Sequence, residues 1–564
     1  MEKILPYISS FYTTPEVERI VRELTLYVKT LPAPESFSFS PNWYKNSTLY
    51  VLYPDSIQLG DSSPLESTKK YLHRIKELGA NAIHLLPFLE SPMMDKGFDV
   101  SNYYKIREGL GGLHALQEIK KEANNLGLHV FMDLIFNHVS REHEWFIKAQ
   151  QGEKYYRDFF IHTRETPQFL GKVYKNSSVY AEYLINGEKE LVSVAFPEFA
   201  GELPHWVEGK DGYWYYHTYY PDQIDLDWKN PEVFIELSKV LLYWTSQGFN
   251  FRLDAIPFIG KPAYKHLNTH NAFTHHLTAV FHVLAHQINP QCTFILETYE
   301  HLDSQIEYFG TANVHQAHML YSFHLTTSLW VSLIEENVQY IWKQLRENKH
   351  IPVHAQWINF LRNHDELSFA YLDKALIEKI HKKLLPFGKA FRDGYGIAGR
   401  TYSLLGSDER RFLMSYFLLA SLPGNILLPY GDEYGVGNVA QSHLPLKEQS
   451  DPRNVSRGYI DQETIESVKG KSVFDHVKLM LASRQLLQDY FTTWPEEITT
   501  KKGVFSARYT IGTSELIVFI NLTKSHQTIS FDTALFEEVA NMNSFTLTKH
   551  EVKLGPYGGV WLQK

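Results

Sequence analysis

The stretch GFNFRLDAI, from Gly248 to Ile256, places two charged residues inside an apolar run. Side chains alternate along a β-strand, so Arg252 and Asp254 point to the same side of this strand. Charged groups inside an apolar strand are costly unless they are paired or have a function. The stretch therefore predicts a buried strand that carries a functional site at its end.

Similar runs rich in Val, Ile, Leu and Phe recur along the chain, and they alternate with amphipathic segments such as STKKYLHRIKEL (67–78). This alternation favours parallel strands that helices cover on both faces. A count of eight is typical of a closed α/β barrel, the (β/α)8 TIM barrel. The eight predicted strands are 48–54, 81–87, 128–135, 250–256, 293–298, 319–323, 357–363 and 425–433.

Three regions lie outside the barrel pattern. Residues 1–42 predict a short N-terminal helical segment that ends in a Pro-containing linker. The segment after the third strand is too long for a barrel loop, which predicts an inserted domain over 140–220. Short strands separated by turns predict a C-terminal all-β sandwich domain over 491–564. The barrel itself is then expected to comprise 43–139 and 221–490.

The composition argues against several classes of protein. A hydrophobic fraction of 44% and a charged fraction of 21% over 564 residues are typical of a soluble globular protein. The net charge of −9, with no basic cluster, argues against a nucleic-acid partner. We see no signal-peptide pattern and no apolar run of about 18 residues that would predict a membrane span. Because Cys292 is the single cysteine, no internal disulfide is possible, and we expect a cytoplasmic protein.

Polar residues stand at the C-terminal ends of several predicted strands, where parallel barrels carry out their chemistry. A single carboxylate there is usually a cap or part of a loop ion pair. Several acids at one rim repel one another and raise at least one pKa, which is unfavourable for stability and useful for catalysis. The residues at these positions are Asp99, Tyr103, Asp133, Asn137, His138, Arg252, Asp254, Glu297, Asn363, His364 and Asp365.

Several acids, an arginine and no cofactor motif are typical of glycoside hydrolysis. In that chemistry one carboxylate attacks the anomeric carbon, and a second, protonated carboxyl group donates to the leaving oxygen. A further anion stabilises the positive charge of the transition state. Asp254 is the candidate nucleophile, and we expect Arg252 to keep it ionised and oriented.

The motifs DLIFNHVS, GFNFRLDAI, FILETYE and FLRNHDEL, in this order, resemble the four signature regions of the alpha-amylase family of glycoside hydrolases. The long insert and the β-rich tail resemble the family's domains B and C, so the resemblance covers nearly the whole chain. It implies that Asp254 is the nucleophile, Glu297 the general acid/base and Asp365 the transition-state stabiliser. It also implies retention at the anomeric carbon, with the first two carboxyl groups about 5–5.5 Å apart.

The resemblance also implies a set of sugar-binding residues around one glucose unit. Asp99 and Tyr103 would grip and stack the sugar. Arg457 would pair with Asp99 and close the pocket, as in exo-acting relatives, and Arg453 is the other candidate. The remaining implied contacts are His138, Arg252 and His364.

Other segments bear on the substrate and on cofactors. Residues 396–438 are most similar to trehalose synthases and related glucosyltransferases, and QIDLDWKNPEVF is similar to exo-acting α-glucosidases and amylosucrases as well. The family's R-T-P-M-Q-W sequence after strand eight is replaced by SRGYIDQ. QLGDSSPLEST, after strand one, lacks the spacing of a calcium loop, so we expect no cofactor and no calcium at that loop, and bound calcium elsewhere stays open.

The function that these features predict is cleavage of α-glucosidic bonds in a small oligosaccharide or disaccharide. Hydrolysis and transfer to another sugar, including trehalose synthase-like isomerisation, both remain open, because the acceptor site decides between them. The alternative from another class is a non-catalytic carbohydrate-binding protein on the same fold. All three candidate acids are present, which disfavours this alternative.

Two further patterns have competing interpretations. His282 and His286 are four positions apart on a predicted helix, as in some metal sites, but a packed or solvated helix face is the preferred interpretation. A metal-dependent barrel hydrolase would need such a cluster at the strand ends. The aromatic residues of DGYWYYHTYYPDQ (211–223) either stack acceptor sugars or pack the insert.

Overall fold

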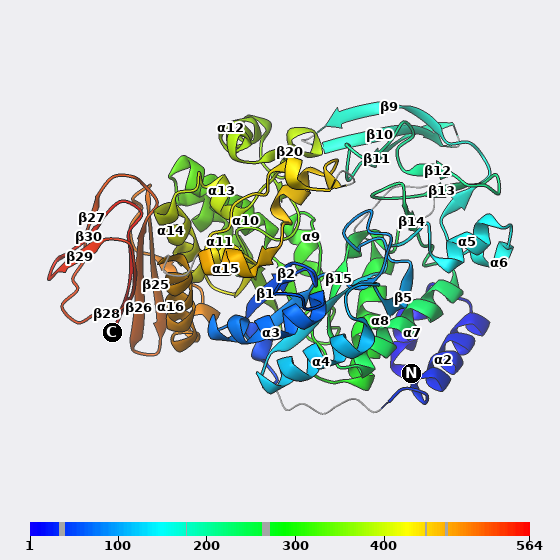
Figure 1. Ribbon diagram of the computed structural model, residues 1–564, viewed down its shortest axis with the longest axis horizontal. Helices are drawn as coiled ribbons and strands as arrows, with labels where there is room; N and C mark the ends of the chain where they lie inside the picture. The colour runs from blue at the N-terminus through cyan, green and yellow to red at the C-terminus, as the bar shows by residue number, and fades with distance from the viewer. Residues whose placement is uncertain (33–39, 176–177, 186, 262–270, 446–447, 468–471) are drawn as a thin grey trace.

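In the computed structural model, eight parallel strands close into a barrel and pair in the order in which they follow one another along the chain (Figure 1). The structure describes residues 1–32, 40–175, 178–185, 187–261, 271–445, 448–467 and 472–564. All eight predicted strands are present, so the predicted barrel is confirmed. The strands are β1 (Thr48–Leu52), β3 (Ala82–Leu85), β6 (His129–Ile135), β15 (Asn250–Asp254), β16 (Phe294–Leu296), β17 (Met319–Tyr321), β18 (Gln356–Asn359) and β22 (Asn425–Pro429).

Helices cover the outside of the barrel, which explains why the strands are apolar on both faces. Every residue of β6 is buried, as expected for a strand between the barrel interior and a helical layer. Asn230 caps the helix after the insert by accepting a hydrogen bond from the Glu232 backbone N–H, and Pro231 stands at its first position. The outer helices are α3 (Pro64–Glu77), α4 (Gly112–Asn125), α7 (Pro231–Ser246), α8 (Ala272–Ile288), α9 (Leu302–Glu307), α10 (Phe323–Glu335), α11 (Gln339–Asn348), α14 (Glu409–Ala420) and α16 (Ser472–Leu486).

The insert leaves the barrel after the third strand and returns through a short antiparallel pair. β7 (His138–Ser140) pairs with β14 (Gln223–Asp225), so both ends of the insert meet at the rim. The insert has a small core of its own, which includes Val179, Ala181 and Tyr183. Its sheets lie at one end of the molecule (Figure 1), and they comprise β9 (Gln168–Lys175), β10 (Ser178–Ile185), β11 (Glu188–Ser193), β8 (His162–Thr163), β12 (Trp206–Glu208) and β13 (Trp214–Tyr216).

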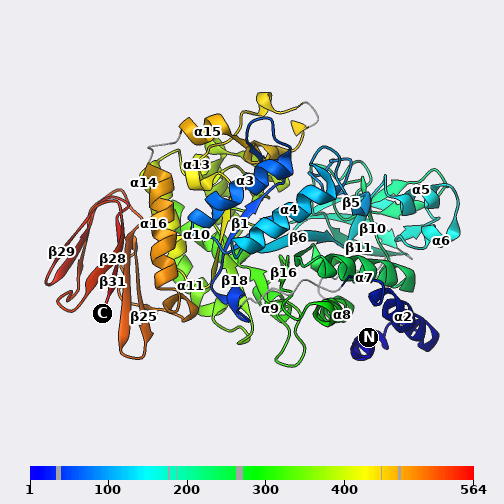
Figure 2. The same cartoon turned by 60° about the horizontal axis from the view of Figure 1, so that its bottom comes forward.

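The opposite end of the molecule is formed by two antiparallel sheets of the C-terminal region (Figure 2). Val504, Phe519 and Val552 contribute to a core between them, as expected for the predicted all-β tail. Trp561 joins this region to the barrel, because its ring stacks on Phe417 of α14 at 4.9 Å. The strands are β24 (Glu496–Glu497), β25 (Val504–Ile511), β26 (Ser514–Asn521), β31 (Gly559–Gln563) and β28 (Glu537–Met542), and β27 (Gln527–Ser530), β30 (Glu551–Leu554) and β29 (Phe545–Thr548).

Further elements lie at the N-terminus and after the seventh barrel strand. The first helices are α1 (Leu5–Ile8) and α2 (Thr14–Val28), and the predicted linker that follows falls largely on 33–39, outside the described residues. A small sheet after the seventh barrel strand comprises β19 (Leu367–Ser368), β21 (Gly396–Ala398) and β20 (Lys389–Phe391), next to α12 (Lys374–Leu384). None of the helices in the described ranges is both long and apolar enough to cross a membrane. The domain limits given above stay predictions.

Candidate active site

A cavity of about 960 Å³ opens at the C-terminal ends of the barrel strands. Its floor carries the three predicted acids, Asp254, Glu297 and Asp365. The insert contributes one wall through Val194 and Phe196, and the segments that follow the seventh strand contribute the other. The cavity therefore lies between three parts of the chain that are far apart in sequence.

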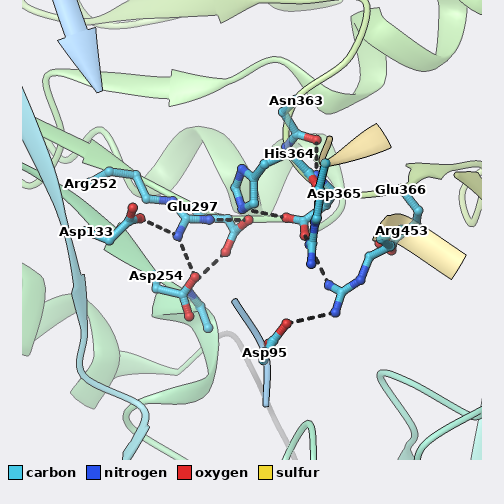
Figure 3. Close-up of polar contacts among 12 residues, drawn as sticks. Asp95, Asp133, Arg252, Asp254, Glu297, Asn363, His364, Asp365, Glu366 and Arg453 are labelled. Atoms are coloured by element: carbon cyan, nitrogen blue, oxygen red, sulfur yellow. Dashed lines mark hydrogen bonds and ion pairs between the residues drawn. The ribbon is translucent and has the colours of Figure 1, made fainter. Parts of the chain in front are cut away.

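Arg252 joins three carboxylates beneath this floor (Figure 3). Its Nη1 lies 2.7 Å from Oδ1 of Asp133 and 2.5 Å from Oδ1 of Asp254, and its Nη2 lies 2.7 Å from Oε1 of Glu297. The arginine is fully buried, so these ion pairs are shielded from solvent. His84 Nε2 lies 2.9 Å from the other oxygen of Asp133, which holds that carboxylate in place. The guanidinium thus fixes the positions of Asp254 and Glu297 relative to each other.

The register of the barrel explains this arrangement. Arg252 in β15 lies directly opposite Asp133 in β6, so the two side chains share the inner face of the barrel. Directly after the strand, Ala255 adopts a left-handed backbone with φ of 48°, which is uncommon for a residue other than glycine. Its backbone N–H donates to Oε2 of Glu297 at 3.1 Å. A strained residue at the rim therefore positions the second acid.

Asp365 lies across the floor and is surrounded by nitrogen groups of one histidine and two arginines. Nε2 of His364 lies 3.0 Å from Oδ2, whereas Nη1 of Arg453 and Nη2 of Arg457 lie 3.1 and 3.2 Å from Oδ1. Burial by itself would raise the pKa of Asp365, but the histidine and the two arginines hold it well below the usual range. This carboxylate is therefore an anion over the whole neutral pH range.

The charge balance at Asp254 is different. Burial raises its pKa, Arg252 lowers it, and the carboxylates of Glu297, Asp133 and Asp365 raise it again. The net result is a pKa well above the ordinary value. The repulsion predicted from the sequence is present, and Arg252 acts in the predicted direction. Burial and the neighbouring acids outweigh this effect, so the expectation that Arg252 keeps Asp254 ionised stays a prediction, whereas the ion pair with Arg252 orients the carboxylate.

A second arginine closes the cavity on one side. Nη2 of Arg453 lies 2.9 Å from Oδ1 of Asp95 and 2.7 Å from the hydroxyl oxygen of Tyr220 (Figure 3 shows the pair with Asp95). Asp451 binds the same guanidinium through both carboxylate oxygens. Burial alone would raise the pKa of Asp451, but Arg453 and Arg457 outweigh it and lower the pKa to about 2. The link between Asp95 and Arg453 thus joins the loop after the second strand to the segment after the eighth.

The structure corrects the predicted role of Asp99. This residue is fully buried and does not line the cavity. Its carboxylate accepts hydrogen bonds from Ser91 Oγ and Met94 N at 2.8 Å each and from Asp95 N at 3.2 Å. Burial raises its pKa to about 6. Asp99 therefore shapes the loop that presents Asp95.

The predicted pair between Arg457 and Asp99 is also wrong. Arg457 binds Asp365 and lies 3.6 Å from Asp451, and the ion pair across the cavity is formed by the other candidate, Arg453, with Asp95. The spacing of the motif led to this error, because both acids stand in DKGFD and only the fold shows which of them points outward.

Tyr103 does not stack in the cavity as predicted. It is buried below the rim, where its hydroxyl group donates to the carbonyl oxygen of Ile135 at 2.7 Å. Phe98 takes the expected place in the cavity wall, and its ring stacks on that of His364 at 5.3 Å and 9°. The sequence carried a usable signal, since Phe98 directly precedes Asp99 in the same motif.

The two predicted histidines, His138 and His364, both line the cavity. Nε2 of His138 donates to the carbonyl oxygen of Phe98 at 3.1 Å, which leaves Nδ1 as the acceptor of the ring.

The aromatic residues of the insert segment 211–223 have different positions, some at the cavity and some in the core of the insert. Tyr219 lines the cavity, whereas Tyr215 and Tyr216 are buried inside the insert.

Sequence reasoning missed several groups in the outer part of the cavity. Glu366 directly follows Asp365 and pairs with Arg392, with 2.6 Å between Oε1 and Nε. Tyr299, Glu300 and Tyr371 line the same region. Only the position of Glu366 beside a signature acid could have indicated it, because Arg392 comes from a loop without a recognisable motif.

The contacts of the segment after the first strand bear on the expected absence of calcium there, which stays a prediction. In QLGDSSPLEST, Nζ of Lys70 from the following helix donates to the hydroxyl oxygen of Ser62 at 2.7 Å. Ser67 uses its hydroxyl oxygen to accept a hydrogen bond from the Leu59 backbone. An ammonium group therefore occupies the neighbourhood in which a calcium loop would need negative oxygen ligands.

Comparisons with known proteins agree with this geometry. The family model described as "Alpha amylase, catalytic domain" matches residues 51–385. The chain is 31% identical over 405 residues to the trehalose synthase of Thermus thermophilus, a match that covers 71% of this chain and 39% of that protein. The glucosylglycerate phosphorylase of Spirochaeta thermophila is 25% identical over 590 residues, which covers 97% of this chain and 94% of that protein.

The fold comparison covers nearly the whole chain. A crystal structure of an alpha-amylase from H. orenii superimposes with a TM-score of 0.70 at 20% identity, and the match covers 92% of this chain and 99% of that chain. The chain spans well under half of the T. thermophilus relative, so nothing about that whole protein is transferred here. The matched catalytic-domain model covers more than half of the sequence, and on this evidence the chain belongs to the alpha-amylase family.

Proposed function

We propose that this protein is a retaining enzyme that cleaves the α-glucosidic bond of a small glucoside and passes the glucosyl group to an acceptor. The observation that carries the proposal is the single buried guanidinium of Arg252, which binds Asp254 and Glu297 on the cavity floor. It holds a nucleophile and an acid in a fixed relation, as this chemistry requires.

In the first step a carboxylate oxygen of Asp254 bonds to the anomeric carbon while the bond to the leaving oxygen breaks. Glu297 gives its proton to that leaving oxygen. In the second step the acceptor hydroxyl gives its proton to Glu297, and the acceptor oxygen displaces Asp254 from the sugar. Asp365, which His364 and two arginines keep anionic, stabilises the positive charge that develops on the sugar ring.

The electrostatics of the acid cluster bear on this division of roles. Burial and the neighbouring carboxylates raise the pKa of Asp254, so a proton within the buried cluster is favoured. The first step needs this proton on Glu297, where it serves the leaving group, and needs Asp254 as the anion beside Arg252. The transition state favours this arrangement, because the positive charge that develops on the sugar as the bond breaks is stabilised by an ionised Asp254.

The closed side of the cavity favours a small substrate cleaved from its non-reducing end. The pair between Arg453 and Asp95 blocks that side, and Phe98 and His364 form a stacked apolar edge beside it. A cavity closed on this side has room for one glucose unit there, so a longer sugar chain cannot extend past that unit. The name of the T. thermophilus relative, trehalose synthase, makes trehalose the first sugar to test, together with its isomer maltose.

A second candidate is transfer of the glucosyl group to inorganic phosphate. It is favoured by the match to the glucosylglycerate phosphorylase, which extends over nearly the whole of both chains. Lys374 and Arg392 line the outer cavity, where a phosphate acceptor would enter. The two candidates share the first step and differ only in the acceptor.

Product analysis separates these possibilities. The enzyme is incubated with maltose, with trehalose and with either sugar plus phosphate, and the products are separated by chromatography. Trehalose formed from maltose supports isomerisation, glucose alone supports hydrolysis, and glucose 1-phosphate supports phosphorolysis. If sugars bind without any turnover, the protein is a non-catalytic binding protein and the proposal is wrong.

The role of Asp254 has a direct test. Asp254→Asn keeps the shape of the side chain and removes its nucleophilic oxygen, so we expect kcat to fall by at least about 1,000-fold. The wild-type chain, incubated with a 2-fluoro-glucosyl fluoride, should gain one sugar on the peptide that contains Asp254, as read by mass spectrometry. The same label on the variant, or unchanged turnover, would remove Asp254 from this role.

A further inference from the structure

Five histidines gather on the side of the barrel opposite the cavity. His282 and His286 lie on α8, and His318 directly precedes β17, at the N-terminal end of that strand. His315 and His354 lie beside them, with 5.5 Å between the ring centroids of His282 and His315 and 4.0 Å between those of His315 and His354. The cavity lies at the C-terminal ends of the strands, so the proposed glycoside chemistry involves none of these histidines.

Three of these rings are close enough to share one ion. The centroids of His282 and His286 are 3.9 Å apart, and the ring of His318 lies 5.1 and 5.5 Å from them. One nitrogen of each ring lies within 4.8 Å of the other two. Metal–nitrogen bonds of 2.0–2.1 Å in a tetrahedral site place the ligand atoms about 3.4 Å apart, so small side-chain rotations complete the geometry.

The hydrogen bonds of the helical pair leave two lone pairs available. Nε2 of His286 donates to the carbonyl oxygen of Cys292 at 2.8 Å, so its Nδ1 carries no proton in the neutral ring. The ring of His282 is hydrogen-bonded to the Gln316 backbone, and its buried Nδ1 has no hydrogen-bond partner among the residues that the structure describes. A backbone carbonyl on the far nitrogen is the usual support of a metal-binding histidine.

Two rings of the cluster are shielded from solvent, because His282 and His318 are both buried. Neutral imidazole is the form that binds metals, and a buried lone pair without a partner is unfavourable unless a ligand uses it.

We propose that His282, His286 and His318 bind one divalent transition-metal ion such as Zn²⁺. Three neutral nitrogen ligands suit an ion of this class and do not suit Ca²⁺ or Mg²⁺, which prefer oxygen. Of the three ligands, His318 has to give up a hydrogen bond to bind the ion, because its Nδ1 accepts one from the Phe294 N–H at 3.1 Å. Binding through Nε2 moves the ring proton to Nδ1 and opens this hydrogen bond.

The expected role of the ion is structural. It would join α8 to the start of β17 on the face of the barrel that in this fold contributes to stability and not to catalysis. Removal of the metal should therefore lower the melting temperature and leave turnover of a glucoside at 25 °C unchanged. The inference and the proposed function can therefore fail separately. An absence of turnover would contradict the proposed function and would not affect metal binding.

The test uses the full chain without a histidine tag, after treatment with a chelator and its removal. Zn²⁺ is titrated by calorimetry, and melting is followed with and without the ion. We expect one Zn²⁺ per chain and a higher melting temperature. The double variant His282→Gln/His286→Gln should lose both effects, whereas His276→Gln, on the same helix with its ring bonded to the Tyr7 carbonyl oxygen, should keep them.

Two results would overturn the proposal. One is the absence of Zn²⁺ binding to the wild-type chain, and the other is equal binding by the double variant, which would place the ion on other histidines. If circular dichroism shows that the double variant does not fold, His318→Gln replaces it, and a Kd for Zn²⁺ raised at least tenfold is then expected. An unchanged Kd in that variant would also contradict the site.

Discussion

Asp95 and Asp99 lie in one loop, four positions apart, and have opposite environments. Asp95 faces Arg453 across the cavity, and Asp99 is turned inward onto the backbone of its own loop. The two carboxylates therefore make different contributions to the folded protein. Asp95 contributes a charge to the cavity wall, whereas Asp99 satisfies backbone donors that would otherwise be buried without a partner.

This contrast predicts different effects for two matched substitutions. Asp95→Asn should raise KM or lower kcat/KM by about 10- to 100-fold, because its ion pair with Arg453 is lost, with little change in stability. Asp99→Asn should mainly destabilise the protein, by about 1–3 kcal/mol, because an amide cannot accept all three hydrogen bonds equally well.

Steady-state kinetics and urea denaturation of both variants check this prediction. The two variants serve as controls for each other, since the substitution is the same and the positions share one loop. Loss of activity in Asp99→Asn with unchanged stability, together with a fully active Asp95→Asn, would restore the assignment made from the sequence.

At the scale of secondary structure, a residue at the start of β6 makes the stability of the folded chain depend on pH. His129 stacks on Trp43 with 3.4 Å between ring centroids, and burial together with Lys120 and Lys76 lowers its pKa to about 3. The unfolded chain binds a proton at the ordinary pKa of about 6.5, whereas the folded chain does not. The stabilisation is therefore complete above pH 6.5 and is lost as the pH falls towards 3.

His129→Phe keeps an aromatic ring against Trp43 and removes the titration. Between pH 6.5 and 5 the free energy of unfolding of the wild-type chain should fall by about 2 kcal/mol more than that of the variant. Denaturant titrations at several pH values measure this difference. Parallel pH dependences in the two proteins would show that His129 is protonated in the folded state.

At the scale of the whole molecule, the C-terminal sheets are fixed to the barrel by a few large residues. Trp561 stacks on Phe417, and its Nε1 donates to Ser421 Oγ at 2.7 Å. Tyr509 donates to the carbonyl oxygen of the same serine at 2.6 Å. The C-terminal sheets that carry Trp561 and Tyr509 lie at the other end of the molecule from the sheets of the insert (Figure 1).

Trp561→Ala removes one of the largest fully buried side chains and should destabilise the protein by about 3–5 kcal/mol. The activity of the folded fraction at 25 °C should stay within about twofold of the wild type, because no cavity residue is touched. Calorimetry and kcat measured on the same samples check both statements. A large loss of kcat without a loss of stability would mean that the C-terminal sheets take part in the chemistry.

Much of the site could be predicted from the sequence because parallel strands bring their C-terminal ends to one rim. Asp254, Glu297 and Asp365 each follow a strand that its apolar run and its flanking helices identify, so their convergence was predictable. Arg252 was predictable for the same reason, since it stands two positions before Asp254 in an alternating strand. In these cases local periodicity and barrel topology were sufficient.

The partners of these residues were decided by the tertiary structure. Whether Asp95 or Asp99 faces Arg453 depends on how one loop turns, and the pair between Glu366 and Arg392 joins loops that no periodic pattern relates. The two histidines of α8 and His318, which directly precedes β17, likewise meet only when the barrel closes. Strand and helix patterns record local burial, which the sequence by itself determined, whereas contacts between loops depend on backbone paths and on the balance of charge and burial in the folded chain.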